Sequence, residues 1–243
     1  MNKYEHVIII PARFKSSRFP GKPLVNLCGK SMIHRVWERC CLALPAELVY
    51  VATDDLSISN HCEALGMQVI MTPSSCLTGT DRVYEASKIV AADIYINVQG
   101  DEPLIDPNDI KQVIATSTRY PDNIVNAMCP IASEHDFYSS TVPKVVTRPD
   151  GRLLYMSRAA IPTNKKLEFG DAKKQVCIYA FPKNSLEKFS CVETKTPLEE
   201  IEDIEILRFL ELGYDVNMIE VSASSVAIDV PADVVRVEAI LNA

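Results

Sequence analysis

Basic residues gather in one short segment near the start of the chain. Residues 11–24 read PARFKSSRFPGKPL, and the cations of this segment are Arg13, Lys15, Arg18 and Lys22. A nucleoside triphosphate carries about four negative charges near neutral pH, so it binds where fixed cations and N–H or hydroxyl donors surround its oxygens. A charge run alone is more often a solvated loop, but the prolines and the glycine restrict the course of this one. The segment is therefore a candidate phosphate-binding loop.

Two adjacent carboxylates follow an apolar run in YINVQGDEP, residues 95–103. A hard cation such as Mg²⁺ is held by one or two protein carboxylates and takes its other ligands from water and phosphate oxygens. Asp101 stands where such a ligand is needed, directly after a predicted strand. Its alternative role would be to cap the helix predicted at residues 107–118. Asp106, just before Pro107, fills that role better, so Asp101 is a candidate metal ligand.

A third acidic segment, AIDVPAD at residues 227–233, leaves two roles open for Asp229. This residue follows a predicted short strand and precedes a helix that begins at Pro231, so it suits the N-cap of that helix. Paired with Asp101, it is equally a candidate second metal ligand. The segment alone does not decide between the two roles.

The acidic segment LEEIEDIEILR is predicted to lie in one helix over residues 198–212. The buried face of this helix is expected to carry Ile201, Ile204 and Leu207. Glu202 and Glu205 are three residues apart and are expected to share another face. Most acidic helix faces are simply solvated, so these two carboxylates are weak candidates for a site by themselves.

The composition disfavours several classes of function. The net charge is −7, which argues against nucleic acid as the main partner, because a phosphate backbone requires a broad basic surface. The eight cysteines include no CxxC pair, so no zinc knuckle is expected, and scattered thiols favour a cytoplasmic protein. The apolar run of residues 7–10 is too short for a signal peptide, so no membrane insertion is expected.

Several well-known motifs are missing from the sequence. The triplet Gly29-Lys30-Ser31 looks like the end of a P-loop, but Leu24 stands where the first glycine is required. The chain contains no GxG, which removes the dinucleotide fingerprint of an oxidoreductase. It also contains no GxSxG or HExxH, and its four histidines share no ligand spacing. A triad hydrolase and a zinc enzyme are therefore disfavoured.

The elements that must position these residues alternate between strands and helices. Apolar runs predict strands at residues 6–11, 48–53, 68–72, 93–98 and 124–128, with helical periodicity between them. This alternation indicates βαβ units, and hence an α/β, Rossmann-like fold with a mostly parallel, doubly wound sheet.

The pattern changes after residue 130. Residues 142–147 and 153–157 flank the turn RPDG and predict an antiparallel hairpin. Further strands are predicted at residues 175–181, 216–221 and 226–229. The chain is interpreted as one domain, residues 1–243, in which residues from about 130 to 180 form an inserted antiparallel lobe.

Taken together, these segments resemble the 3-deoxy-manno-octulosonate cytidylyltransferases, or CMP-KDO synthetases. The resemblance covers almost the whole chain and rests on IPARFKSSRFPGKPL, YVATDD, MTPSSCLTGTDR, INVQGDEPLI, PKVV, LLYMSRAAIP, IYAF, PLEEIEDIEILR and AIDVPADVVRV. It implies a Rossmann-like nucleotidyltransferase that uses Mg²⁺ to join CMP from CTP to a 2-keto sugar acid and releases pyrophosphate. It also implies a homodimer built through the inserted lobe and a product used for lipopolysaccharide or capsule synthesis.

The resemblance also implies roles for individual residues, carried over by position. Catalytic roles fall on Arg13, Lys22 and Asp101, and magnesium ligands on Asp101 and Asp229. Nucleotide contacts fall on Pro11, Ala12, Arg13, Ser16, Ser17, Lys22 and Thr80. The sugar-acid pocket would be lined by Gln99, Arg158, Gln175, Tyr179 and Glu205. Arg158 would be the bidentate partner of the acid's carboxylate.

Two departures from the family fall on the expected sugar side. Residues 174–179 read KQVCIY where the family usually reads RHLGIY, so Gln175 replaces a histidine, and Ile206 replaces a glutamine. We therefore keep open a different acceptor, such as an 8-modified or nine-carbon 2-keto sugar acid. A nucleotide-binding regulator without turnover is the second alternative, which the intact phosphate and metal motifs disfavour.

Overall fold

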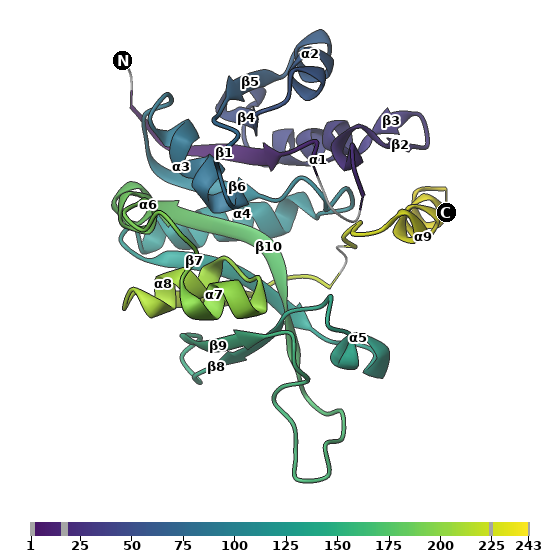
Figure 1. Cartoon of the computed structure of the whole chain (residues 1–243), viewed down its shortest axis with the longest axis vertical. Coiled ribbons are helices and arrows are strands. Elements are labelled where there is room, and N and C mark those ends of the chain that lie inside the picture. The colour runs from purple at the N-terminus through teal and green to yellow at the C-terminus, as the bar shows by residue number, and fades with distance from the viewer. Residues whose placement is uncertain (1–2, 16–18, 224–225, 243) are drawn as a thin grey trace.

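The structure, a computed structural model, describes residues 3–15, 19–223 and 226–242. Strands and helices alternate along the first half of the chain, as the sequence predicts (Figure 1). The strands are β1 Tyr4–Ala12, β2 Asn26–Leu27, β3 Lys30–Ser31, β4 Val49–Thr53, β5 Gln68–Met71, β6 Ala92–Val98, β7 Ile124–Pro130, β8 Lys144–Thr147, β9 Leu153–Ser157, β10 Lys173–Pro182 and β11 Val216–Glu220. The helices are α1 Met32–Cys41, α2 Leu56–Ala64, α3 Gly79–Ser87, α4 Pro107–Arg119, α5 Glu134–Tyr138, α6 Lys183–Ser190, α7 Pro197–Glu202, α8 Ile206–Glu211 and α9 Pro231–Leu241.

One large sheet runs through the centre of the molecule. Within the described residues its spatial order is β11-β7-β10-β6-β1-β4-β5. The strands β5, β4, β1 and β6 pair in parallel, and so do β7 and β11. Strand β10 lies antiparallel between β6 and β7. The predicted mostly parallel, doubly wound sheet is confirmed, with one long strand running the opposite way through its middle.

Helices cover both faces of this sheet because successive side chains of a strand point to opposite faces. Ile8 and Ile10 of β1 pack in one hydrophobic core with side chains of α1, α2 and α4. Val7 and Ile9, their neighbours along the strand, pack in a second core with side chains of α3, α6 and α8. Because β1 and β6 pair in parallel between these cores, the loops that follow them lie at the same edge of the sheet.

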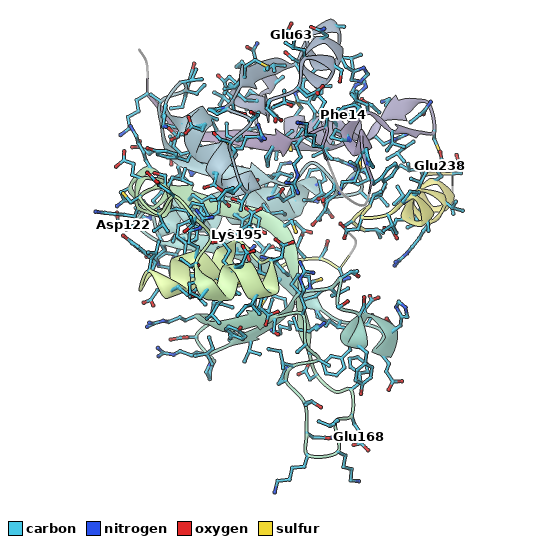
Figure 2. All side chains as sticks on the ribbon, in the orientation of Figure 1. Phe14, Glu63, Asp122, Glu168, Lys195 and Glu238 are labelled. Atoms are coloured by element: carbon cyan, nitrogen blue, oxygen red, sulfur yellow. The ribbon has the colours of Figure 1, made fainter. Side chains whose placement is uncertain are left out.

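A smaller lobe lies below the sheet in Figure 1 and is built from β8, β9 and α5. The predicted hairpin is confirmed: β8 and β9 pair antiparallel around a turn in which Gly151 has a φ of +86°. Strand β10 begins in this lobe, where Lys173 pairs with Val145 of β8. The loop before β10 carries Glu168, which Figure 2 shows far from the sheet. Strand β10 therefore connects the lobe to the main sheet.

The helix predicted over residues 198–212 is wrong, because the chain forms two shorter helices there. Asp203 follows α7 with a φ of 49° and a ψ of 50°, and this left-handed conformation ends the helix. Glu202 and Glu205 lie on either side of the break instead of on one helical face. Ile201, predicted to be buried, is 77% exposed, whereas Ile204 and Leu207 are buried as predicted.

The strand predicted at residues 226–229 is also wrong. These residues form neither a strand nor a helix. The N–H of Ile228 donates to the carbonyl oxygen of Asp101 at 2.9 Å. This backbone contact brings the segment before α9 to the end of β6, although no regular ladder forms. Among the described residues, no helix is both long and apolar enough to cross a membrane.

A fully buried ion pair holds α7, α8 and α3 together. Arg208 of α8 is 0% exposed and donates through Nε and Nη2 to the carboxylate of Glu199 at 2.6 and 2.7 Å. Its Nη1 donates to Asp81 in the first turn of α3 at 3.1 Å. Buried charges are tolerated only in good geometry with their hydrogen bonds made, and the bidentate contact meets this condition. The network therefore fixes the corner between α7 and α8.

We predict that Arg208→Met lowers the free energy of unfolding by about 3–5 kcal/mol, because it leaves the Glu199 carboxylate buried without its partner. Urea unfolding followed by circular dichroism measures the change. Arg119→Met, at the exposed end of α4, is the matched control and is expected to change stability by no more than about 0.5 kcal/mol. Equal effects of the two substitutions would contradict the role assigned to the buried pair.

Candidate active site

A cavity of about 530 Å³ opens at the carboxyl ends of β1 and β6, where open α/β sheets bind their ligands. Its walls come from the loop after β1, the N-terminus of α3, the end of β6, strand β10, the α7–α8 corner and the segment before α9. Lys195, near the middle of the view in Figure 2, also lines it. The predicted residues that line it are Pro11, Ala12, Arg13, Lys22, Gln99, Asp101, Arg158, Gln175, Tyr179, Glu205 and Asp229. Ser16 and Ser17 lie outside the described residues.

Three of these segments meet at the ammonium group of Lys22. Its Nζ donates to Asp101 Oδ2 at 2.9 Å and to the carbonyl oxygen of Ile228 at 2.8 Å. Asp229 Oδ1 lies 3.9 Å from the same nitrogen. The side chain of Lys22 is only 14% exposed, so water and salt screen these attractions less than they screen a surface ion pair. The structure thus brings together the candidate phosphate loop and both candidate metal ligands.

The N-terminus of α9 bears on one of the two roles that the sequence leaves open for Asp229, that of the helix cap. Asp233 Oδ2 accepts the backbone N–H of Asp229 at 2.8 Å and that of Val230 at 2.9 Å. A carboxylate one turn into the helix therefore bonds the amides at its start. The N-cap of α9 is Val230 and the side chain of Asp229 lies beside Lys22, so Asp229 does not cap this helix; its role as a metal ligand stays a prediction.

Two glycines allow close approaches next to this junction. A Cβ atom on Gly100 would lie 3.0 Å from the carbonyl oxygen of Pro11, where the ends of β6 and β1 meet. A Cβ atom on Gly79 would lie 2.7 Å from Nε2 of Gln99. A side chain at position 100 would press on the backbone of β1, whereas one at position 79 would displace the flexible side chain of Gln99 from its place in the cavity wall.

Glu205 and Thr80 bind each other at the N-terminus of α3. Glu205 accepts the N–H of Gly79 at 3.0 Å, the N–H of Thr80 at 2.8 Å and the Thr80 hydroxyl at 2.6 Å. Burial raises the pKa of Glu205, although these hydrogen bonds oppose the rise. Thr80 is 1% exposed and lies behind the cavity lining. The nucleotide contact predicted for Thr80 is therefore corrected: its hydroxyl supports Glu205, which lines the cavity as predicted.

Arg158 lines the cavity, but its guanidinium group is bonded to the backbone. Nη1 donates to the carbonyl oxygen of Ser140 at 2.9 Å and Nη2 to that of Asp203 at 2.9 Å. Nε donates to the carbonyl oxygen of Glu202 at 2.5 Å. The break at Asp203 leaves helix carbonyls without helical partners, and Arg158 supplies the missing donors. Three of the five N–H groups of Arg158 thus bind the protein and one remains on each of Nη1 and Nη2, so the bidentate clamp predicted for Arg158 stays a prediction.

Glu202 and Lys144 fix the backbone of Arg158 in turn. The Glu202 carboxylate accepts the Ser157 hydroxyl at 2.6 Å and the Arg158 N–H at 2.8 Å. Burial acts to raise the pKa of Glu202, but these hydrogen bonds outweigh it and the pKa is lowered. Lys144 is 0% exposed and donates to the carbonyl oxygens of Arg158 at 2.6 Å and Ser139 at 2.7 Å. This wall of the cavity is therefore held by a buried cation and a carboxylate.

Gln175 and Tyr179 line the cavity from β10, as predicted. The pairing of β10 with β7 shifts register between Val176 and Tyr179, which marks a β-bulge. The prediction that Ile206 lies beside them on the sugar side is wrong. It is 1% exposed in the core formed by α3, α6 and α8, outside the cavity lining. The change from glutamine to isoleucine therefore removes no amide from the wall of the cavity.

Sequence reasoning misses several buried polar residues that support these walls. Glu102 is 4% exposed, and its Oε1 accepts the N–H of Cys177 at 3.0 Å. Arg82 is 3% exposed and lines the cavity, and its Nη2 lies 3.2 Å from Asp54 Oδ1. Lys144 stands inside the apolar run of a short strand. A charged residue within an apolar or motif segment is the signal that these positions share, because burying such a residue requires compensating contacts.

The chain matches the cytidylyltransferase family over residues 7–219. It is 39% identical to the 3-deoxy-manno-octulosonate cytidylyltransferase of Syntrophotalea carbinolica, over 96% of this chain and 97% of that protein. The Escherichia coli protein of the same name is 37% identical over 97% of this chain and 95% of its own length. The chain belongs to this family.

Two further members relate the family to the geometry of the site. A solved structure of CMP:2-keto-3-deoxy-manno-octonic acid synthetase complexed with CTP has a TM-score of 0.88 and 36% identity, covering 98% of both chains. The 8-amino-3,8-dideoxy-manno-octulosonate cytidylyltransferase of Shewanella loihica is 38% identical over 93% of this chain and 94% of that protein. The chain is therefore a CTP-dependent nucleotidyltransferase with the cytidylyltransferase fold. Because relatives named for two different acids are about equally similar, the residues of the site must decide the acceptor.

Glu202→Gln tests the support of Arg158. The pKa of Glu202 is lowered in the folded protein, so its carboxylate stabilises the fold above its ordinary pKa of 4.5, and this stabilisation is lost as the pH falls through the lowered pKa. We predict that the substitution lowers the free energy of unfolding by about 1–2 kcal/mol at pH 7, and that this cost disappears as the pH falls through the lowered pKa of Glu202. Chemical denaturation at a series of pH values measures it, with Glu200→Gln, exposed on the same helix, as control. A cost that does not change with pH would contradict the assignment.

Proposed function

We propose that the protein transfers CMP from CTP to KDO or a close relative, an eight-carbon 2-keto sugar acid, and releases pyrophosphate, for lipopolysaccharide synthesis. The observation that carries the proposal is the junction of Lys22 with Asp101 and Asp229 in the wall of a cavity large enough for a nucleotide. The likeness to a synthetase solved with CTP, over nearly the full length of both chains, supports CTP as donor. The names of the relatives support the acceptor.

Magnesium is the proposed cofactor, with Asp101 and Asp229 as its protein ligands. Two carboxylate oxygens from these residues already flank a cation, the Lys22 ammonium, at 2.9 and 3.9 Å, so the pair is suited to bind positive charge. The described part of the chain holds no group of three or more His, Cys, Asp or Glu side chains that could bind a metal. Two carboxylates are sufficient for Mg²⁺, which completes its octahedron with water and phosphate oxygens. When bound, Mg²⁺ would neutralise charge on the phosphates.

Positioning and charge stabilisation drive the proposed reaction. Arg13 and Lys22 would bind the phosphates of CTP, beside Pro11 and Ala12 at the end of β1. The anomeric hydroxyl of the acid attacks the α-phosphorus in line with the departing pyrophosphate. A sugar oxygen–phosphorus bond forms while the bond from that phosphorus to pyrophosphate breaks, and the hydroxyl proton passes to water. Such transfers depend on alignment and on stabilising negative charge, so they need no covalent enzyme intermediate.

The acceptor is proposed to lie against Gln99, Gln175, Tyr179 and Glu205, with Arg158 at its edge. These residues line the same cavity as Lys22 but come from other segments. An acid with an amino group at carbon 8 is a second candidate acceptor. It is supported by the name of the Shewanella loihica relative and by Gln175, which stays neutral where the family usually has a histidine.

We also propose that the protein is a homodimer of the cytoplasm. Tyr138, Leu154 and Leu167 of the lobe are 49%, 55% and 68% exposed. A second copy seated on the lobe would remove this apolar surface from water. The eight cysteines carry free thiols, as suits a reducing compartment.

Pyrophosphate release tests the proposed function. With Mg²⁺ and KDO, the protein is expected to release pyrophosphate from CTP much faster than from ATP or GTP. Release should stop when the acid is omitted or when EDTA removes the metal. Mass spectrometry should find CMP joined to the acid. Release no faster than background with every acid of a panel that includes the 8-amino and nine-carbon acids would leave a nucleotide-binding regulator as the better interpretation.

Asp101→Asn and Asp229→Asn are each predicted to lower kcat at least about a hundredfold, the scale of losing one electrostatic contact in a catalytic site. Asp106→Asn is the matched control, because Asp106 caps α4 and asparagine caps a helix equally well. Steady-state kinetics and thermal melting are measured for all three variants. An Asp229→Asn protein that melts at a lower temperature and keeps its kcat would show that Asp229 is structural.

A further inference from the structure

Asn126, a buried residue of β7 to which no role has been given so far, is held in a single orientation. Its side chain is 0% exposed. Its Nδ2 donates to the carbonyl oxygen of Val176 at 3.1 Å and to that of Ile178 at 2.9 Å, both on β10. A carbonyl oxygen only accepts hydrogen bonds and an amide nitrogen only donates them. Turning the Asn126 amide over would place its own oxygen against two carbonyl oxygens, so the position of its Oδ1 is determined.

The fixed amide of Asn126 determines which way the amide of Gln175 is turned. Asn126 Oδ1 accepts a hydrogen bond from Gln175 Nε2 at 3.0 Å. A reversed Gln175 amide would bring two oxygens together, so the nitrogen must face Asn126. Gln175 Oε1 then lies on the other side of the planar group. Gln175 lines the cavity, and in the described part of the chain its Oε1 takes no protein hydrogen bond.

The bulge in β10 holds this arrangement from both sides. The register of β10 against β7 shifts within residues 176–179. On the β6 side, the N–H of Cys177 donates to Glu102 Oε1 at 3.0 Å, and its carbonyl oxygen accepts the N–H of Gln99 at 3.1 Å. On the β7 side, Asn126 binds the carbonyls before and after Cys177. Because the bulge is bonded to both neighbouring strands, it aims the side chains of β10 in a defined direction.

We infer that Gln175 determines acceptor specificity by offering a hydrogen-bond acceptor to the sugar acid, and that Asn126 is the positioning residue that sets this polarity. The inference rests on the proposed acceptor side of the cavity. A hydroxyl or ammonium group of the acid can donate to Gln175 Oε1. A carboxylate or carbonyl oxygen placed there would leave two acceptors facing each other without a hydrogen bond, which is unfavourable in a partly desolvated site. The cavity therefore favours a sugar acid that carries a hydrogen-bond donor opposite Gln175 Oε1.

Replacing the hydroxyls of KDO with fluorine one at a time tests the role of Gln175, because a fluorine substituent cannot donate a hydrogen bond. At the position whose hydroxyl donates to Gln175, fluorine is expected to lower the kcat/KM of the natural protein about tenfold, and this loss is the fluorine penalty. An amino group at the same position is expected to restore kcat/KM. In Gln175→Leu, which offers no acceptor, the fluorine penalty is expected to fall to about twofold or less. The KM for CTP should stay the same in both proteins.

Two results separate this inference from the function on which it rests. If the natural protein turns over KDO but no fluorine penalty depends on Gln175, the inference is overturned and the proposed function stands. If no acid supports pyrophosphate release at all, the proposed function fails and the inference fails with it. A larger penalty for an amino group than for fluorine at the sensitive position would also overturn the inference, because it would mean that the protein offers a donor there.

Asn126→Ser tests the positioning role, since a serine side chain is too short to hold the Gln175 amide. In this variant the Gln175 amide can flip, so that its nitrogen faces the cavity. The loss of kcat/KM caused by the fluorine substituent is then expected to fall below about threefold. The KM for the acid should rise while the KM for CTP is unchanged, a split that general destabilisation would not produce.

Asn217→Ser, on the neighbouring strand β11 and outside the cavity lining, is the matched control. A fluorine penalty in kcat/KM that stays near tenfold in folded Asn126→Ser would overturn the positioning role of Asn126. Gln175→Leu tests the polarity of the pocket independently if Asn126→Ser does not fold.

Discussion

The ammonium group of Lys22 joins three parts of the chain that are far apart in the sequence. It belongs to the loop after β1, donates to Asp101 at the end of β6, and donates to the carbonyl of Ile228 just before α9. Two carboxylates held close together repel each other, and a cation placed against both offsets that repulsion. The course of the loop, the path of the segment before α9 and the shape of the cavity between them therefore all depend on this one positive charge.

The sequence predicts the first half of the fold well because local and tertiary preferences agree there. The apolar runs at 6–11 and 93–98 are central strands, and each is followed by a loop that faces the cavity. The predictions fail where tertiary contacts override the local pattern. A segment with good helical periodicity breaks at Asp203, where the carbonyl oxygens of Glu202 and Asp203 accept hydrogen bonds from Arg158 instead of from helical N–H groups. Ile206 follows that break, so its side chain enters the core and not the pocket.

Much of the candidate site could likewise be predicted, for a physical reason. Residues such as Arg13, Gln99 and Asp101 lie just after strands, and the ends of parallel strands meet at one edge of a sheet. What could not be predicted is the layer behind them. Asn126 is a polar residue within a buried strand, and its partners lie some fifty residues away on β10. Nothing local to such a residue shows whether its amide is satisfied, or by which group, until the pairing of the strands is known.

Strand β10 runs against the direction of its neighbours, and this separates the two halves of recognition. The loop after β1 supplies Arg13 and Lys22, the residues proposed for the triphosphate, whereas β10 carries Gln175 and Tyr179, which are proposed for the acceptor. Point substitutions along one strand can therefore alter the sugar acid while the strands that serve CTP remain untouched. In evolutionary terms the fold is modular: a lineage can adopt a new cell-surface sugar without having to reinvent the chemistry that activates it.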